Sequence, residues 1–240
     1  SYATGGGSAG NVEAQSIDAL VDTLAYVDSV INPYEASGGA DQQSIENLMK
    51  IAPKRFKHRF RAVTQEDYFY LALEASSDVA KVSVKQQRGK ITLYLIPHGQ
   101  QKMPLPSRGL KKVVRDYLGE RAPATVELEV MQAEYIRVNV SLGIELSEWE
   151  YASSIKSSIN DVLDAFLHPV TGGKESSGWE FGSLPSLADV YNLLHSIEGI
   201  DEVPSLTLAL SNGSNYSIHS PQMPSLDKNT IISSGSHSVE

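Results

Sequence analysis

Cysteine is absent from this sequence of 240 residues, and no apolar run approaches the length of a membrane span. Without cysteine the chain forms no disulfide, carries no thiol nucleophile and offers no thiolate to a metal. A spanning helix needs about 18 or more consecutive apolar residues, so we expect no membrane span. The start also lacks the charged-then-apolar pattern of a signal peptide. The length favours two small folded units over one.

Patterns that carry catalysis, cofactors or metals are also missing. None of the six histidines belongs to an HExxH or lies at metal spacing from another ligand. A dinucleotide-binding loop has GxGxxG spacing and follows a strand, whereas the glycines from Gly5 have neither feature. The phosphate-binding motif GxxxxGK[ST] and the nucleophile motif GxSxG do not occur. Asp161 and Asp164 share a helix face without a partner base. We therefore expect no catalytic residue, no cofactor and no metal site, and a protein that is not an enzyme.

Charge is divided into three blocks along the chain. Residues 1–49 carry seven acids and no lysine or arginine, residues 50–121 carry sixteen bases and six acids, and residues 122–240 carry four bases and sixteen acids. The blocks have net charges of −7, +10 and −12, which give the −9 of the whole chain. Such blocks can be matched across subunit interfaces. Chance segregation on solvated faces is an equal alternative.

Helical spacing dominates residues 1–75, which we assign to a glycine-rich, helical linker or bundle region. After a loop over residues 1–11, three helices are expected: over residues 17–24, from an N-cap at Asp41 towards Pro53, and from the capping pair Thr64 and Asp67 through Leu73. The apolar stripes of this region exceed what one short helix can bury alone, so bundling with neighbouring subunits is expected.

The rest of the chain predicts an α+β fold of two tandem small α/β sandwich units. Residues 76–132 read β-β-α-β: a hairpin turning at Arg88-Gly89, a helix over residues 110–118 closed by Gly119, and a strand over residues 126–130. Residues 133–210 read β-α-α-β, from strand 136–146 through helices 155–167 and 187–197 to strand 203–210. We expect residues 211–240 to be a loose tail, in which only residues 230–232 could add a strand.

The segment from Lys54 to Arg61 interleaves bases with aromatics. It could grip phosphates and stack bases, which makes an RNA-binding α/β module the alternative function. A helix that buries Phe56 and Phe60 on one side, or a contact with an acidic neighbour, is favoured instead. The strand from Lys90 to Pro97 also lacks the paired stacking aromatics of RNA-recognition modules. We therefore expect no nucleic acid as a partner.

The segment from Gly178 to Gly182 places Trp179 and Phe181 between glycines. Large aromatics bury much area with few torsions lost, so they suit either a plug in the core or an anchor for a partner. A core plug is favoured over an interface anchor.

Six stretches together resemble the baseplate J-like family of contractile-tail phages and related injection machines. They are residues 5–11; Asn32-Pro33 leading to 36–41; Ala52-Pro53; Arg59, 61–64 and Asp67-Tyr68; Pro169, Gly173 and 178–182; and Ile197, Gly199, Ile200 and Val203. The structural or interface candidates are Asn32, Pro33, Gly38, Gly39, Asp41, Arg59, Arg61, Thr64, Asp67, Tyr68, Gly178, Trp179, Phe181 and Gly182.

The resemblance implies a wedge or ring component of a baseplate without enzymatic activity. Its implied partners are copies or paralogues of itself and the hub, tube or sheath-initiating proteins. Its implied place is the virion tail baseplate, assembled in the host cytoplasm. Family members usually begin with a further β-rich region, so the resemblance implies a fragment or a shortened relative. A small-molecule regulatory α/β domain remains a third function class, which ligand-dependent melting would reveal.

Overall fold

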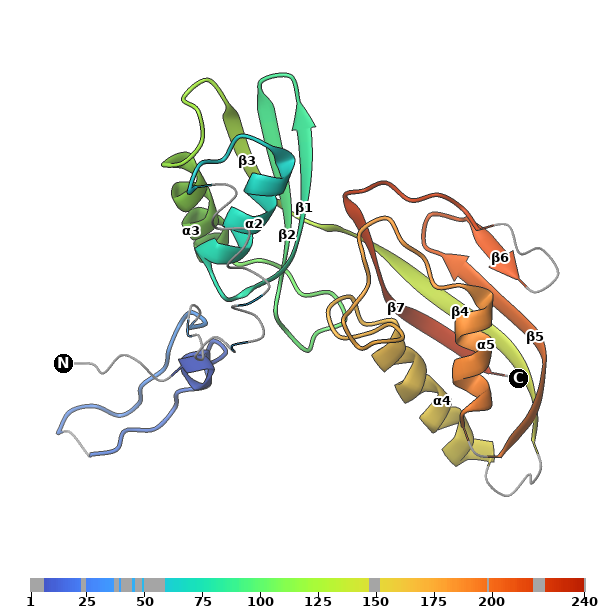
Figure 1. Cartoon of the computed structure of the whole chain (residues 1–240). Coiled ribbons are helices and arrows are strands. Elements are labelled where there is room, and N and C mark those ends of the chain that lie inside the picture. Colours follow the sequence, from blue (N-terminus) through green and yellow to red (C-terminus); the bar gives the residue numbers. More distant parts are fainter. Residues whose placement is uncertain are drawn as a thin grey trace. The chain divides into compact units, whose positions relative to one another are not determined.

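Residues 7–22, 25–36, 39, 45, 49, 59–146, 152–197, 199–217 and 223–239 are described in the computed structural model. The chain has an α+β fold, as the sequence predicts, and it divides into two units (Figure 1). Unit 1 comprises Ser1–Pro97 and Pro106–Met131, and unit 2 comprises His98–Leu105 and Gln132–Glu240. Among the described residues, no helix has the length and apolar character that crossing a membrane requires.

Two of the helices in unit 1 pack against a three-stranded sheet of order β1-β2-β3. These elements are α2 (Gln65–Ala75), β1 (Val79–Gln87), β2 (Lys90–Pro97), α3 (Arg108–Gly119) and β3 (Glu127–Gln132). The predicted hairpin is confirmed: β1 and β2 pair antiparallel, with Gln87 opposite Lys90. Gly89 has a φ of 76°, a conformation that glycine adopts at little cost.

Side-chain caps begin helices α2 and α3. The capping box predicted at Thr64 and Asp67 is present, with each side chain accepting a hydrogen bond from the other residue's backbone N–H. The Ser107 hydroxyl accepts from the N–H of Leu110 and so caps α3. Gly119 is the last helical residue rather than the residue after the helix, because α3 continues to a C-cap at Glu120.

The core of unit 1 joins α2 and α3 to all three strands of the sheet. Tyr68 and Leu71 of α2 pack into the same buried cluster as Leu93 of β2 and Val114 of α3. Helix α2 is therefore an integral part of this unit, whereas the sequence assigns it to the N-terminal linker region. Burial of this apolar stripe, rather than helix propensity alone, stabilises so short a helix.

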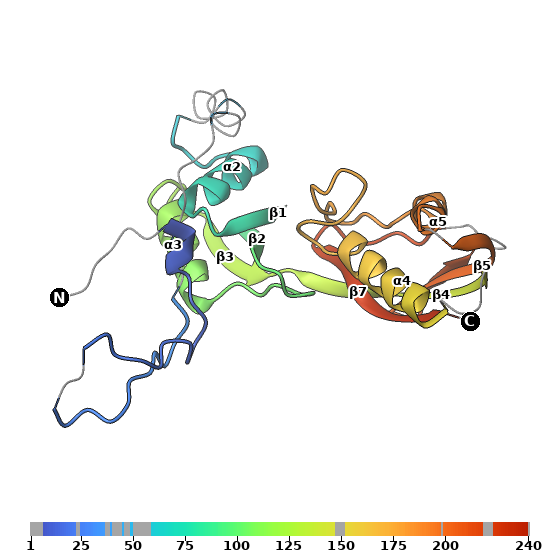
Figure 2. The same ribbon diagram turned by 90° about the horizontal axis from the view of Figure 1, so that it is seen from below.

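The described residues of unit 2 form two helices and a four-stranded sheet of order β6-β5-β4-β7. Its elements are β4 (Glu134–Leu146), α4 (Ala152–Phe166), α5 (Leu187–His195), β5 (Ile200–Leu210), β6 (Asn215–Ser217) and β7 (Thr230–Val239). Strand β4 pairs antiparallel with β5 and parallel with β7. Helices α4 and α5 cover one face of the sheet (Figure 2).

The prediction of a loose tail after residue 210 was wrong. Residues 230–239 form β7, and residues 215–217 form β6. Side chains from Thr230 to Ser234 are buried, and Ile232 belongs to the core of unit 2. The serines of this segment hid its strand character, because their hydroxyls break the apolar alternation that marks a half-buried strand.

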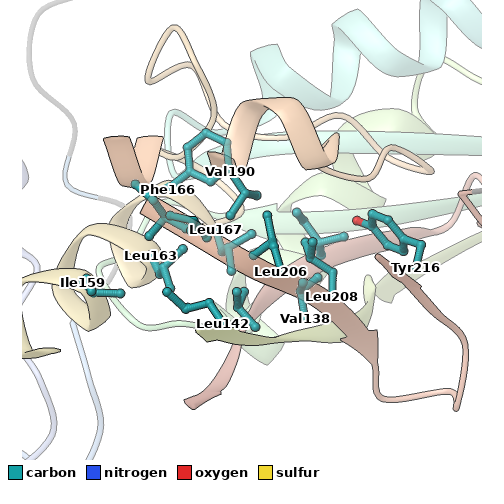
Figure 3. Close-up of a cluster of buried hydrophobic side chains, with 14 of the residues drawn as sticks. Val138, Leu142, Ile159, Leu163, Phe166, Leu167, Val190, Leu206, Leu208 and Tyr216 are labelled. Atoms are coloured by element: carbon teal, nitrogen blue, oxygen red, sulfur yellow. The ribbon is translucent and has the colours of Figure 1, made fainter. Parts of the chain in front are cut away.

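The core of unit 2 fills the space between the sheet and its two helices (Figure 3). The helices contribute Leu163 of α4, Leu167 just after α4 and Val190 of α5. These side chains pack with Val138 of β4 and Leu206 of β5. These five side chains are fully buried or nearly so. The predicted apolar faces of both helices therefore point at the sheet.

The helix predicted over residues 17–24 was wrong where the structure describes it. Residues 16–22 contain no helix, and the short 3-10 helix η1 (Gly7–Gly10) lies upstream instead. Ile45 and Met49 are helical, as predicted, whereas Asp41 and Pro53 lie outside the described residues. The helical spacing at 17–24 gains no buried partner, since Ile17 and Val21 are exposed.

Candidate functional site

Two asparagines organise the described residues before unit 1's folded core. Asn11 pairs its side-chain amide with the backbone of Gly39: Nδ2 donates to the carbonyl at 2.9 Å and Oδ1 accepts from the N–H at 2.7 Å. A Cβ on Gly39 would lie 2.1 Å from the carbonyl oxygen of Gly7. Residue 39 must therefore be glycine for this approach.

Asn32 ties the two ends of the following loop together. Its Nδ2 donates to the carbonyls of Glu13 (2.8 Å) and Tyr34 (3.0 Å), and its Oδ1 accepts from the N–H of Ile17 (2.9 Å). Its own carbonyl accepts from the N–H of Gln15 at 2.8 Å. The described residues of the two motifs that begin the family resemblance, among them Asn11, Asn32 and Gly39, thus belong to one hydrogen-bonded structure. We call residues 12–36 the N-terminal loop.

The N-terminal loop carries exposed apolar side chains and acids. The large apolar residues exposed to solvent are Ile17, Leu20, Val21, Tyr26, Val27, Ile31 and Tyr34. The acids are Glu13, Asp18, Asp22, Asp28 and Glu35, all exposed, and residues 12–36 include no lysine, arginine or histidine. Exposed apolar patches of this kind mark interaction sites in folded proteins.

The candidates around residue 60 divide between surface and core. Arg59 and Arg61 are exposed, whereas Tyr68 is buried in the core of unit 1. Burial, and secondarily the charge of Asp67, raises the pKa of the Tyr68 hydroxyl. The prediction that a helix buries Phe60 was wrong. Arg59 and Phe60 have φ angles of 45° and 58°, which are not helical, and Phe60 is 55% exposed. Residues 54–58 lie outside the described residues.

The Gly178–Gly182 segment is a tight loop against the end of α4. The Trp179 indole N–H donates to the Phe166 carbonyl at 2.8 Å, and the two rings meet edge to face at 5.3 Å. Trp179 packs against the core of unit 2, the position that a core plug would take, and Phe181 is half-buried. A Cβ on Gly178, whose φ is 76°, would lie 2.3 Å from the Val170 carbonyl oxygen.

The structure brings four of the candidates into two clusters. Asn32 and Gly39 lie in the hydrogen-bonded N-terminal structure, and Thr64 and Asp67 form the cap of α2. The Gly182 N–H donates to the Thr230 carbonyl at 2.8 Å and so joins its loop to β7. Pro33 is exposed, and Gly38 and Asp41 lie outside the described residues.

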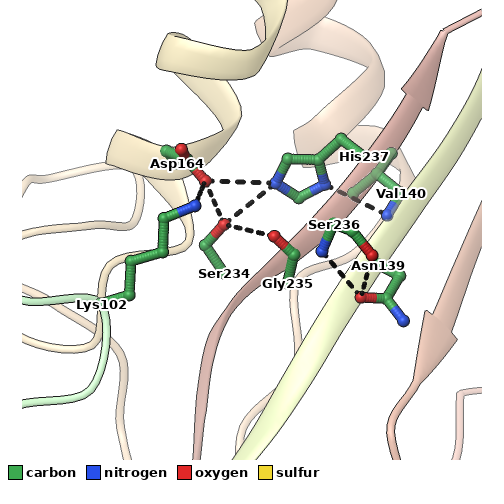
Figure 4. A network of polar contacts seen from close by, with 8 residues as sticks. All are labelled: Lys102, Asn139, Val140, Asp164, Ser234, Gly235, Ser236 and His237. Carbon is green, nitrogen blue, oxygen red and sulfur yellow. Dashed lines mark hydrogen bonds and ion pairs between the residues drawn. The ribbon is translucent and has the colours of Figure 1, made fainter.

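A polar network that the sequence reading missed lies between β7 and α4 (Figure 4). Asp164 accepts a hydrogen bond from the Ser234 hydroxyl, and its Oδ1 lies 2.6 Å from Lys102 Nζ and 3.5 Å from His237 Nε2. The Ser234 hydroxyl is 3.0 Å from the same ring nitrogen. Burial opposes ionisation of Asp164, but the hydrogen bonds from Lys102 and Ser234 outweigh it and lower its pKa.

A β-bulge places Ser234 and His237 on the same side of β7. Residues three apart in a strand face opposite sides. In the β4–β7 ladder, however, Val138 pairs with Ser234 and Val140 with His237, so two residues of β7 oppose the single Asn139. The Asn139 Oδ1 accepts from the Ser236 N–H at 2.9 Å and holds the bulge.

This Ser–His–Asp arrangement is not that of an activated nucleophile. The His237 Nδ1 accepts the N–H of Val140 at 3.2 Å, so the neutral ring carries its proton on Nε2. A general base facing Ser234 needs Nε2 unprotonated, and the orienting carboxylate belongs at Nδ1. Burial lowers the pKa of His237, although Asp164 opposes the shift. The network therefore ties elements together rather than activating Ser234.

The network also anchors the segment His98–Leu105 within unit 2. Besides Lys102 on Asp164, the carbonyl of Gln101 lies 3.0 Å from the buried His168 Nε2, and the Tyr135 hydroxyl donates to the Pro104 carbonyl at 2.6 Å. Burial raises the pKa of Tyr135, which keeps this hydroxyl protonated. In the described part of the chain, no cluster of three His, Asp or Glu side chains could hold a metal.

Neither a protein-family model nor a curated protein matches this chain. Among solved structures, the fold is similar to that of a chain in the "Cryo-EM structure of the anti-feeding prophage (AFP) baseplate, 6-fold symmetrised", with a TM-score of 0.58 and 17% sequence identity. The likeness covers 91% of this chain and 47% of that chain, so this chain spans about half the length of the one it matches. At this identity the likeness shows a shared fold.

Proposed function

We propose that this chain is a non-enzymatic structural component of a contractile-tail baseplate, in a phage or a phage-like injection machine. The fold likeness carries the proposal. It covers 91% of this chain, so it extends over both units and reaches into the N-terminal region. The motif residues that suggested the baseplate J-like family support it independently. Several of them have backbone roles: Asn32 and Gly39 order the N-terminal loop, and Gly178 permits the tight loop at the end of α4.

In this proposal the chain joins a wedge or ring that links hub, tube and sheath, in the tail baseplate that forms in the host cytoplasm. Its partners are copies or paralogues of itself and other baseplate proteins. The exposed acids and apolar side chains of the N-terminal loop offer one contact surface. Arg59 and Arg61, both exposed, offer another that suits an acidic neighbour.

The RNA-binding alternative gains no support from unit 1. RNA-recognition modules stack bases on aromatics of an open sheet face. Here both sides of the central strand β2 are buried, since Leu93 and Leu95 pack into the core and Tyr94 and Ile96 are also buried. Binding of single-stranded RNA that weakens steeply with salt would nevertheless revive this alternative.

Co-expression with the tail proteins encoded beside this chain tests the proposal. We expect the chain to co-purify with tube, sheath-initiating or spike proteins, and to be found at the base of assembled particles by electron microscopy. Arg59→Glu with Arg61→Glu should abolish this assembly and leave the monomer folded. Arg88→Glu with Arg137→Glu, two other exposed arginines, makes the same change in charge and serves as the control. A chain that stays monomeric beside these proteins and turns over a substrate would refute the proposal.

A further inference from the structure

The N-terminal loop exposes apolar and acidic side chains that are not buried or paired within the described residues of the chain. Val21 and Tyr26 are fully exposed, and no acid of the loop forms an ion pair with another described residue. The loop is held by backbone and asparagine hydrogen bonds at its base, which leave these side chains to solvent. A surface that is both apolar and negatively charged fits a partner surface that is positively charged and offers aliphatic area.

Helix α3 presents such a surface. Arg108, Lys112 and Arg115 are exposed and lie within about 60° of one another around the helix, at about 100° per residue, with Lys111 beside them. No ion pair joins these four bases to an acid within the described ranges. Their methylene stems supply aliphatic surface and their charges stay at the tip. The opposite side of α3, with Leu110, is buried in unit 1.

We infer that the N-terminal loop of one copy docks against the basic face of helix α3 in a second copy. The two surfaces differ, so the contact is head to tail, the type that closes into a ring or continues as an open filament. The inference rests on the proposed function in taking assembly as the purpose of the loop, and it names one partner: another copy of this chain. Charge complementarity selects that occupant.

A pair of charge-reversed chains tests this docking. The loop variant carries Asp18→Lys, Asp22→Lys and Asp28→Lys; the helix variant carries Arg108→Glu, Lys112→Glu and Arg115→Glu. All six side chains are exposed, so both variants should fold, which far-UV circular dichroism checks. Sedimentation velocity of the purified full chain measures self-association at low and at high salt.

We expect the wild type to self-associate, and each reversed variant alone to associate at least about tenfold more weakly, because like charges then face each other. An equimolar mixture should recover association. The reversed loop of one variant then meets the reversed helix of the other, and the two unaltered surfaces meet as well. High salt should weaken both the wild-type and the mixed assemblies.

Three results would overturn the inference: a monomeric wild type, variants that self-associate as the wild type does, or a mixture that stays dissociated. Tyr26→Ser with Val21→Ser is a milder variant that removes apolar area without changing charge, and it too should weaken association. A chain that fails to self-associate but still co-purifies with tail proteins refutes this docking and keeps the proposed function. A chain that self-associates as expected but does not co-purify with tail proteins refutes the proposed function and keeps this docking.

Discussion

The N-terminal loop and unit 2 are ordered by opposite means. In unit 2 the apolar side chains point inward and form a core between sheet and helices, and polar contacts such as the Asp164 network close its edge. In the N-terminal loop, large apolar side chains such as Ile17, Val21 and Tyr26 are exposed to solvent, and the hydrogen bonds of Asn11 and Asn32 hold the backbone. The backbone of the loop is therefore preorganised, and its exposed apolar area is available for contact with another protein surface. Hydrogen bonds at the surface each contribute about 1 kcal/mol, so this order is local and easily lost.

The largest effect is expected for Gly178→Ala in unit 2. The left-handed conformation costs an L-residue about 1–2 kcal/mol, and the new Cβ would also lie 2.3 Å from the Val170 carbonyl oxygen. We expect a loss of about 3 kcal/mol or more in the free energy of unfolding, measured by urea denaturation.

Gly89→Ala is the matched control for that substitution. Gly89 has the same φ of 76°, but a Cβ there would meet no atom within 4 Å. It should lose only the conformational part, about 1 kcal/mol. Equal losses in the two variants would show that the close approach at Gly178 does not matter.

Asp164→Asn should have the next largest effect. The neutral amide loses the ion pair with Lys102 and weakens the hydrogen bond from Ser234, which should lower the free energy of unfolding by about 1–2 kcal/mol. Asp161→Asn makes the same change on an exposed position of the same helix and should stay within about 0.5 kcal/mol of the wild type. A smaller loss at Asp164 than at Asp161 would contradict the role of the network.

His237 should make stability depend on pH below its ordinary pKa of 6.5. Burial lowers the pKa of His237 in the folded chain, so the unfolded chain binds a proton more readily as pH falls. Its contribution is therefore complete above about pH 6.5 and decreases as pH falls towards the lower folded value. Asp164, Lys102 and Ser234 face the ring, and the lowered pKa of Asp164 acts only at more acidic pH.

His237→Gln should consequently flatten the dependence of unfolding free energy on pH between 7 and 5, measured by urea denaturation at several pH values. The difference between wild type and variant isolates this residue from the other five histidines. An unchanged slope would show that the ring is not held neutral by burial.

Asn32→Ala should change overall stability least and local order most. It removes three side-chain hydrogen bonds at the base of the N-terminal loop, outside either core. We expect faster amide exchange and faster proteolysis within residues 12–36 and an unchanged unfolding transition of the two units. Asn212→Ala, which removes one exposed hydrogen bond at a turn, is the control. A large global loss would mean that the loop is part of a folded core.

Local patterns predicted the parts of the fold that depend on neighbours in sequence. The hairpin at Gly89, the capping box at Thr64 and the apolar face of α4 were all readable, because turns, caps and helical faces depend on residues a few positions apart. The prediction of a helix over residues 17–24 was wrong for residues 17–22, because no surface in the described structure buries their apolar side chains.

The amino-acid sequence by itself determined the α+β class, the order of most elements and where several glycines and caps must stand. Only the tertiary structure decided that residues 230–239 complete a sheet, that a bulge turns Ser234 and His237 towards Asp164, and that Lys102 joins them. Val140 and His237 are 97 positions apart, and their contact depends on strand register and burial. Those are properties of the packed chain, which no local pattern contains.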